Sequence, residues 1–194
     1  MKLLIVSGFL GSGKTTLLLR IARWLTGNGS KVVIVENEVG EIGIDGKYLR
    51  QYGLDVREMY GGCVCCTMRY DLKTTLRKIS EGIRPDWVII EPTGAAYPAE
   101  VKNAALHEMD FFCAARVVTV IDAQRYEMLM EMMMPLMNAQ LDAADIFVVN
   151  KIDSVPNEIV HSVSNSLRES HPEKPTLMLS AEADKNLDAL FALI

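Results

Sequence analysis

The chain has 194 residues, 49% of them hydrophobic, which suits one globular domain that buries about 70% of its unfolded surface. A formal net charge of -5 argues against a nucleic-acid partner, which would need a stripe dense in lysine and arginine, and favours a small ligand or a protein partner. No apolar run approaches the roughly 18 residues of a membrane span, and residues 3–6 are too short a run for a signal-peptide core, so we expect a cytoplasmic protein without a membrane partner.

Strands and helices are expected to alternate along the chain. Residues 3–6 predict a buried strand, residues 16–26 have their leucines at helical spacing, and residues 32–35 are a second strand of the continuous apolar type that parallel sheets use. The other expected elements are a short extra strand at 55–60, helices at 71–82, 98–107, 124–134, 138–144, 156–169 and 187–194, and strands at 87–90, 116–121, 146–149 and 176–179. Pro135 is expected to break or kink the helical stretch around it.

The segment from Gly8 to Thr15, GFLGSGKT, fits the P-loop pattern G-x-x-x-x-G-K-[ST] and directly follows the first strand. Its glycines let successive backbone N–H groups point at a phosphate, and the helix beginning near Lys14 adds its positive dipole end. Lys14 would reach the β- and γ-phosphates as a catalytic residue, and Thr15 would hold Mg²⁺. The nucleotide-binding residues expected here are Gly8, Gly11, Ser12, Gly13, Lys14, Thr15 and Thr16.

Together with six core strands, this motif predicts an α/β fold: a P-loop NTPase three-layer α/β/α sandwich with a mostly parallel sheet, formed by residues 1–194 as a single domain. Ligands of such sheets bind at the carboxyl ends of the strands. The polar segment 36–46 follows the second strand at that end and is therefore expected to be a functional loop.

Asn150, Lys151 and Asp153 form an N-K-x-D sequence at the end of a later strand, where the nucleotide base would lie. The Asp153 carboxylate can accept hydrogen bonds from the ring N–H and the amine of guanine, and adenine offers no such pair of donors, so GTP is expected over ATP. Ser180 and Ala181 follow the last strand and are expected to contact the guanine through their backbone.

Glu91-Pro92-Thr93-Gly94 has the [DE]-x-x-G form expected beside the γ-phosphate. Glu91 would act on Mg²⁺ through water, and the Gly94 N–H would sense the third phosphate, so both are predicted catalytic residues. Asp122, at the end of another strand, is a competing carboxylate on the Mg²⁺ side or simply a strand-end residue.

Three cysteines, Cys63, Cys65 and Cys66, lie within four positions after two glycines. This spacing is a poor disulfide framework but suits three thiolates around one soft or borderline metal ion, Zn²⁺ or Cu⁺, or Co²⁺ or Ni²⁺ with mixed ligands. The alternatives are buried structural cysteines or a redox switch. The carboxylates that could complete a metal site are Glu36, Glu38 and Glu41.

Cys113 stands alone in an apolar run and is expected in the core. The methionines that crowd residues 128–137 favour core or partner contact over metal binding. The three histidines are scattered and form no pair of metal ligands.

With the P-loop, E-N-E-V-G-E at 36–41, G-G-C-V-C-C at 61–66, Glu91–Gly94 and N-K-x-D in this order, the sequence resembles the CobW/HypB/UreG family of P-loop GTPases, and its cysteine motif resembles the CobW-like branch. The resemblance implies slow GTP hydrolysis coupled to handling of zinc, cobalt or nickel for a client metalloenzyme or its maturation partner. By the motif match the metal thiolates are Cys63, Cys65 and Cys66, with Glu36 and Glu41 as nearby carboxylates. Many CobW-like proteins continue into a C-terminal domain and often a histidine-rich stretch, and we expect residues 1–194 to hold neither.

We therefore expect GTP-Mg²⁺ to order segments 36–46 and 91–94 and so to position the cysteine loop for metal or partner binding. No arginine finger is evident from the sequence, so turnover should be slow unless a partner or formation of a homodimer accelerates it. The rival interpretations are a P-loop kinase or ATPase, and a regulatory GTPase switch with structural cysteines.

Overall fold

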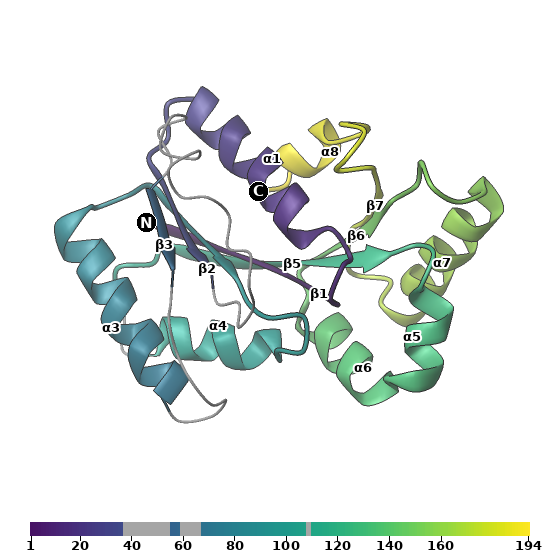
Figure 1. Cartoon of the computed structure of the whole chain (residues 1–194), viewed down its shortest axis with the longest axis horizontal. Helices are drawn as coiled ribbons and strands as arrows, with labels where there is room; N and C mark the ends of the chain where they lie inside the picture. Colours follow the sequence, from purple (N-terminus) through teal and green to yellow (C-terminus); the bar gives the residue numbers. More distant parts are fainter. Residues whose placement is uncertain (37–54, 59–66, 108–109) are drawn as a thin grey trace.

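The computed structural model describes residues 1–36, 55–58, 67–107 and 110–194 (Figure 1). They form a seven-stranded sheet in the order β3-β2-β4-β1-β5-β6-β7, in which every neighbouring pair is parallel. The strands are β1 (Lys2–Gly8), β2 (Val32–Glu36), β3 (Asp55–Glu58), β4 (Trp87–Glu91), β5 (Ala114–Asp122), β6 (Ile146–Asn150) and β7 (Thr176–Met178). The predicted α/β sandwich is confirmed, including the short extra strand.

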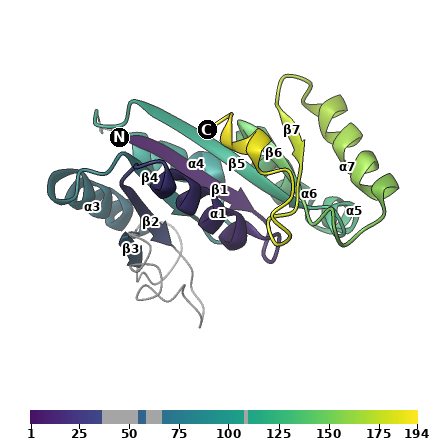
Figure 2. The ribbon, with the colours of Figure 1, turned by 90° about the horizontal axis from the view of Figure 1, so that it is seen from above.

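Helices cover both faces of this sheet (Figures 1 and 2). They are α1 (Lys14–Gly27), α3 (Thr67–Gly82), α4 (Pro98–Leu106), α5 (Tyr126–Met132), α6 (Met134–Ala143), α7 (Asn157–Ser170) and α8 (Asp188–Phe191). The first and last of them, α1 and α8, pack on one face, and the others pack on the opposite face. Strands buried on both faces explain the continuous apolar runs in the sequence, because alternate side chains enter the two core layers.

Strand β1 lies at the centre of the sheet, where the chain changes direction. The connection through α1 leads from β1 to one side, towards β2, whereas the chain from β4 onward moves to the other side through β5, β6 and β7. Open parallel sheets bind their ligands outside the carboxyl ends of the strands at such a point. The P-loop begins there, directly after β1.

Several sequence expectations are corrected. The break expected near Pro135 is confirmed, since α5 ends at Met132 and α6 begins at Met134. The start of the second helix is corrected from residue 138 to Met134, because Pro135 lies in the first turn of α6, where its missing N–H costs nothing. The last helix is only four residues long.

Cys113 is exposed, contrary to expectation, because it precedes the buried part of β5, which begins at Val117. Its thiol donates to the Met1 carbonyl. Met137 is in the core as expected. Four other methionines are exposed: Met128, Met132, Met133 and Met134.

Candidate functional site

The P-loop joins β1 to α1 through glycines that have no room for side chains. Gly8 has φ 140°, and a methyl group there would overlap the Val120 carbonyl of the adjacent strand β5. Gly13 has φ 95°, and its missing side chain leaves space for the Asn150 amide. No capping side chain bonds to the amino end of α1, and its first turn holds no acidic residue, so its N–H groups suit an anion.

Lys14, Thr15 and Glu91 come together beside this loop. The Thr15 hydroxyl donates to Glu91 Oε1 at 2.7 Å, and Lys14 Nζ lies 4.0 Å from the same oxygen. Both charged side chains are about nine-tenths buried, at 7% and 10% exposure. A hydroxyl and a carboxylate in contact are the hard oxygen donors that Mg²⁺ takes beside phosphate. These residues therefore fit a Mg²⁺-nucleotide.

Gly94 lies against the P-loop backbone. A methyl group built on Gly94 would be 2.5 Å from the Leu10 nitrogen. Gln140 of α6, itself buried, donates its amide to the carbonyls of Gly94 and Ala96, at 3.0 and 3.3 Å. The loop after β4 is thus held between the P-loop and α6.

Asn150 connects the P-loop to the segment that follows β7. Its amide nitrogen donates to the Ser12 carbonyl at 2.9 Å, and its amide oxygen accepts from the Ala181 N–H at 3.0 Å. Arg20 of α1 adds a second contact to the same loop, by donating to the carbonyls of Ala181 and Glu182. The structure therefore brings three predicted segments together: the P-loop, N-K-x-D and Ser180-Ala181.

Asp153 is exposed, and a side-chain hydrogen bond from Ser180 holds the pKa of its carboxyl below the ordinary value. A carboxyl with a lowered pKa remains an anion, and hence an acceptor for guanine, throughout the neutral range.

Asp122 lies beside Lys151 of the N-K-x-D sequence. Its buried carboxylate accepts from Lys151 Nζ and from Arg125 Nε, both at 2.8 Å, and from the Gln124 N–H at 3.0 Å. Burial acts to raise the pKa of Asp122, but the hydrogen bonds from Lys151 and Arg125 outweigh it and lower the pKa. Asp122 is therefore a fixed anion that holds two cations.

The predicted transition-metal ligands fall mostly on residues 37–54 and 59–66. Cys63, Cys65, Cys66 and Glu41 lie outside the described residues. Glu36 is described: it is buried at the end of β2 and pairs in register with Glu91 at the end of β4. No group of three metal-binding side chains is found among the residues that the structure describes.

Arg125 and Gln140 are contacts of this site that the sequence analysis did not identify. Arg125 Nη2 donates to the Leu10 carbonyl of the P-loop at 2.6 Å. Its only sequence signal is the three-residue spacing from Asp122, and Gln140 is a single polar residue within a helix, without a motif.

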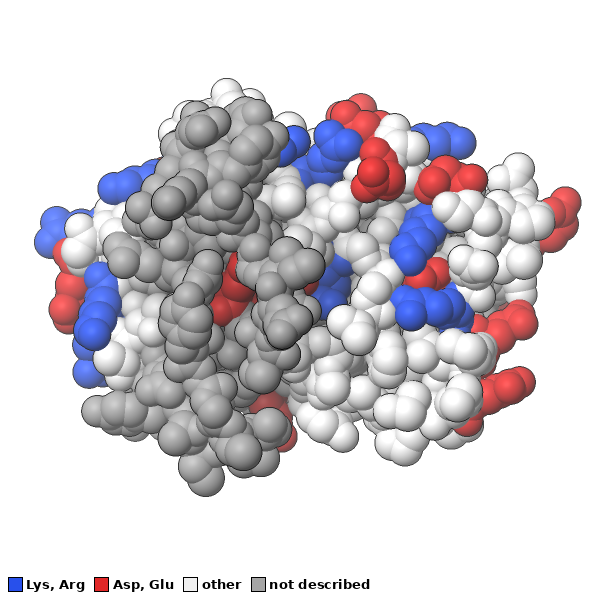
Figure 3. All heavy atoms as spheres, in the orientation of Figure 1, with Lys and Arg blue, Asp and Glu red and all other residues white. Residues whose placement is uncertain are grey.

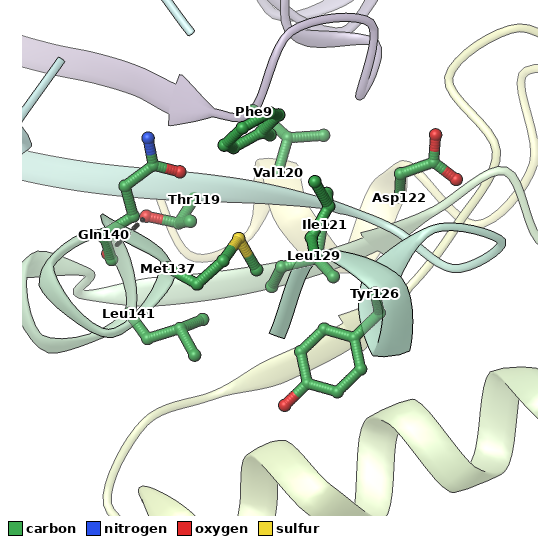
Figure 4. Close-up of a pocket in the computed structure, with 10 residues that line it drawn as sticks. All are labelled: Phe9, Thr119, Val120, Ile121, Asp122, Tyr126, Leu129, Met137, Gln140 and Leu141. Atoms are coloured by element: carbon green, nitrogen blue, oxygen red, sulfur yellow. Dashed lines mark hydrogen bonds between the residues drawn. The ribbon is translucent and has the colours of Figure 1, made fainter. Parts of the chain in front are cut away.

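A small cavity between β5 and helices α5 and α6 lies behind the P-loop residue Phe9 (Figure 4). Leu129, Met137 and Tyr126 line it, so its wall is largely hydrocarbon. A nucleotide needs charged and hydrogen-bonding partners, and those lie at the carboxyl ends of the strands instead.

The surface and helices of the described residues add two observations. On the face shown in Figure 3, basic and acidic side chains are intermixed, and neither kind forms a broad charged patch.

None of the described helices has the length and apolar character needed to cross a membrane.

Comparisons with known proteins agree with this geometry. The zinc chaperone YeiR of Escherichia coli is 33% identical over 79% of this chain and 47% of its own length. The zinc-regulated GTPase metalloprotein activator 1 of Dictyostelium discoideum is 27% identical over 87% of this chain and 43% of its own length. This chain spans about half the length of such curated relatives.

Among solved structures, the hydrogenase maturation factor HypB of Archaeoglobus fulgidus superposes with a TM-score of 0.70 at 18% identity, over 100% of this chain and 88% of that one. Zn(II)-bound YjiA GTPase of Escherichia coli superposes with a TM-score of 0.65 at 23% identity, over 92% and 57% of the two chains. These likenesses support the fold. The model of the CobW/HypB/UreG nucleotide-binding domain matches residues 2–178, and the chain therefore belongs to the CobW/HypB/UreG family.

Proposed function

We propose that this chain is a GTP-hydrolysing metallochaperone or metal insertase, which couples GTP binding and hydrolysis to delivery of a transition metal to a client metalloenzyme. The contact of Thr15 with Glu91 beside Lys14, at the amino end of α1, carries the nucleotide part of this proposal. Thr15 and Glu91 would hold Mg²⁺, which supplies neutralisation of the phosphate charge. Lys14 would hold the terminal phosphates, and Gly94 would sense the third one.

Guanine selection in this proposal depends on Asp153. Asp153 follows β6. Asn150, which precedes it, bonds to both Ser12 and Ala181, and these bonds would fix the distance between the base and the phosphates. Slow turnover is expected, because no partner protein completes the site in the isolated chain.

The metal part of the proposal depends on Cys63, Cys65 and Cys66 as thiolates, with Glu36 and Glu41 as carboxylates. The curated relatives named above are zinc proteins by their names, and a HypB of Helicobacter pylori was solved with nickel. Zn²⁺ is therefore our first choice, with Co²⁺ and Ni²⁺ next, since thiolates suit borderline ions. We place delivery in the cytoplasm, where thiols stay reduced.

The sheet offers a route for coupling nucleotide to metal. Glu36 and Glu91 are neighbours in the β2–β4 ladder, so a proposed carboxylate for the transition metal and a proposed carboxylate for Mg²⁺ lie side by side. A nucleotide that moves Glu91 would change the surroundings of Glu36. If GTP tightens metal binding, metal must tighten GTP binding by the same factor.

The test is a metal titration of the reduced protein with GTPγS-Mg²⁺, GDP-Mg²⁺ or no nucleotide, using Zn²⁺, Co²⁺ and Ni²⁺ in turn. We expect one metal to bind more tightly with GTPγS, and we expect the triple change of Cys63, Cys65 and Cys66 to Ala to abolish that binding. The matched control is Cys113→Ala, which removes the exposed thiol before β5 and should change nothing.

Metal binding that ignores the nucleotide, or that survives the triple change, would favour the regulatory GTPase with structural cysteines. A preference for ATP over GTP would favour the ATPase or kinase.

A further inference from the structure

Arg125 contacts a P-loop residue, Leu10, that lies 115 residues earlier in the sequence. Arg125 lies at the amino end of α5, three residues after the last residue of β5. Its Nε donates to Asp122 Oδ2 at 2.8 Å, and its Nη2 donates to the Leu10 carbonyl at 2.6 Å. A guanidinium is a rigid planar fork, so two contacts made through different nitrogens fix its orientation.

Asp122 gives Arg125 a firm anchor. The Asp122 side chain is 1% exposed and also accepts from Lys151, while the Arg125 side chain remains 35% exposed. A buried carboxylate with three donors keeps its place and its charge. Asp122 is thus the fixed member of the pair, and Arg125 extends from Asp122 to the P-loop.

The Leu10 carbonyl belongs to a peptide group whose N–H, that of Gly11, would face a bound phosphate. In a P-loop the N–H groups point inward and cradle the phosphates, so the carbonyls point outward. The Leu10 carbonyl and the Gly11 N–H belong to one peptide group. A cation bound to the carbonyl polarises this group and makes the Gly11 N–H a stronger donor, since linked hydrogen bonds reinforce one another.

Gly11 makes this approach possible. Its φ is 72°, and a side-chain carbon built there would be 3.1 Å from Arg125 Nη2. The guanidinium therefore lies in the space that the glycine leaves open. Sequence analysis assigned Gly11 to the phosphate alone, whereas the structure shows its outer side in contact with Arg125.

We propose that Arg125, aligned by Asp122, is a positioning residue for polyphosphate binding, and that it acts by orienting and polarising the Leu10–Gly11 peptide. This inference rests on the proposed nucleotide-binding function but not on hydrolysis or metal delivery. In this proposal Arg125, a residue of the chain itself, contacts the backbone carbonyl of the P-loop and not the phosphate. It therefore differs from an arginine that a partner protein would insert into the site.

Arg20 provides a matched comparison, because it makes the same kind of contact at the base side. It donates to the Ala181 carbonyl at 3.1 Å and to the Glu182 carbonyl at 3.2 Å. An arginine that supports the P-loop should affect the preference for GDP over GMP. An arginine that supports the base loop should affect the preference for GDP over ADP.

The experiment measures the dissociation constants of GDP, GMP and ADP by competition with a fluorescent GDP analogue, for wild type, Arg125→Ala and Arg20→Ala. In Arg125→Ala we expect the GDP-over-GMP preference to fall about tenfold or more, the range of a hydrogen bond to a charged group, with the GDP-over-ADP preference unchanged. In Arg20→Ala we expect the reverse. Arg125→Lys keeps the charge but cannot bridge Asp122 and Leu10, so it should recover less than half of the loss on a logarithmic scale.

Two outcomes would overturn the inference: Arg125→Ala lowers both preferences together, or it lowers neither. Full recovery in Arg125→Lys would show that charge without the fork is enough, and would also overturn it. Thermal unfolding of each variant verifies that the folded protein is being measured. If wild type binds the nucleotides but does not hydrolyse GTP or carry metal, the proposed function fails while this comparison still gives its answer.

Discussion

Gly94 is the residue at which the segment after β4 touches the P-loop. Gly94 is not among the glycines with a positive φ, so its backbone conformation would accept an alanine. However, the added methyl group would lie within 2.8 Å of both the Leu10 nitrogen and Leu10 Cα. The two segments would have to separate. The effect of this glycine is therefore on spacing and not on backbone conformation.

We predict that Gly94→Ala lowers kcat/KM for GTP about a hundredfold, because displacements near 1 Å in a catalytic site have effects of that size. The control is Gly82→Ala at the end of α3, where nothing lies within 4 Å of the added methyl group. Steady-state phosphate release measures both variants. Equal activity of the two variants would contradict a spacing role for Gly94.

Asp122 links stability to pH. Its folded-state pKa lies below the ordinary value, so its stabilisation is present above the unfolded carboxyl pKa, about 3.9, and is lost as the pH falls through the folded pKa. Asp122→Asn should lower the free energy of unfolding by about 2 kcal/mol at pH 7. The difference from wild type should shrink as the pH falls below about 4.

Urea unfolding at pH 7 and at acid pH measures this difference. The control is Asp142→Asn, since the Asp142 side chain is 74% exposed beside His171. A difference for Asp122→Asn that grows in acid would contradict the assigned direction.

At the scale of elements, α6 holds the loop after β4 through one buried amide. Gln140 is 2% exposed, and its two donor contacts are to the carbonyls of Gly94 and Ala96. Replacing Gln140 by Leu keeps an apolar contact with the core but leaves these carbonyls without that donor. Both hydrogen bonds are part-buried, and a hydrogen bond of this kind contributes about 0.5–1.5 kcal/mol.

We predict that Gln140→Leu speeds hydrogen exchange in segment 92–97 by about tenfold or more, with little change in the β1–β5 ladder. The control, Asn138→Ala, changes an exposed position on the same helix. Exchange followed by mass spectrometry reads each segment. Uniform acceleration over the whole chain would show general destabilisation and contradict a local role.

The same elements show what a sequence can predict. The apolar runs and the P-loop pattern predicted the strands and their parallel arrangement, because burial on both faces leaves a signal in every residue of a strand. Arg125 and Gln140 left no such signal. Each acts through backbone carbonyls of a distant loop, Arg125 through Leu10 and Gln140 through Gly94 and Ala96, and the pairing depends on the tertiary fold. The break near Pro135 was predicted, but not that this proline lies inside the first turn of α6, because a proline fits both the gap between two helices and the start of the second.

At the scale of the whole molecule, the site joins elements from both halves of the sheet, so a bound nucleotide should stabilise the entire domain. At a free concentration of about 1,000 times Kd, GTP-Mg²⁺ adds about 4 kcal/mol. For a domain of this size we expect the unfolding temperature to rise by about 10 °C. ATP-Mg²⁺ at the same concentration should raise it less.

Differential scanning fluorimetry measures these shifts, with Lys14→Ala as the variant that should lose most of the GTP effect. Equal shifts with GTP and ATP would contradict the base selectivity assigned to Asp153.

The bonds of Asn150 also set the order in which the site can be completed during synthesis. Ser12 leaves the ribosome long before its partner Asn150, 138 residues later, and Ala181 follows a further 31 residues on. Such distant contacts form late, because a long loop must close first. A nascent chain that displays only the P-loop strand has half of a nucleotide site. We therefore expect guanine nucleotide to bind only after the whole domain has folded, and not to assist the folding of the first half of the chain.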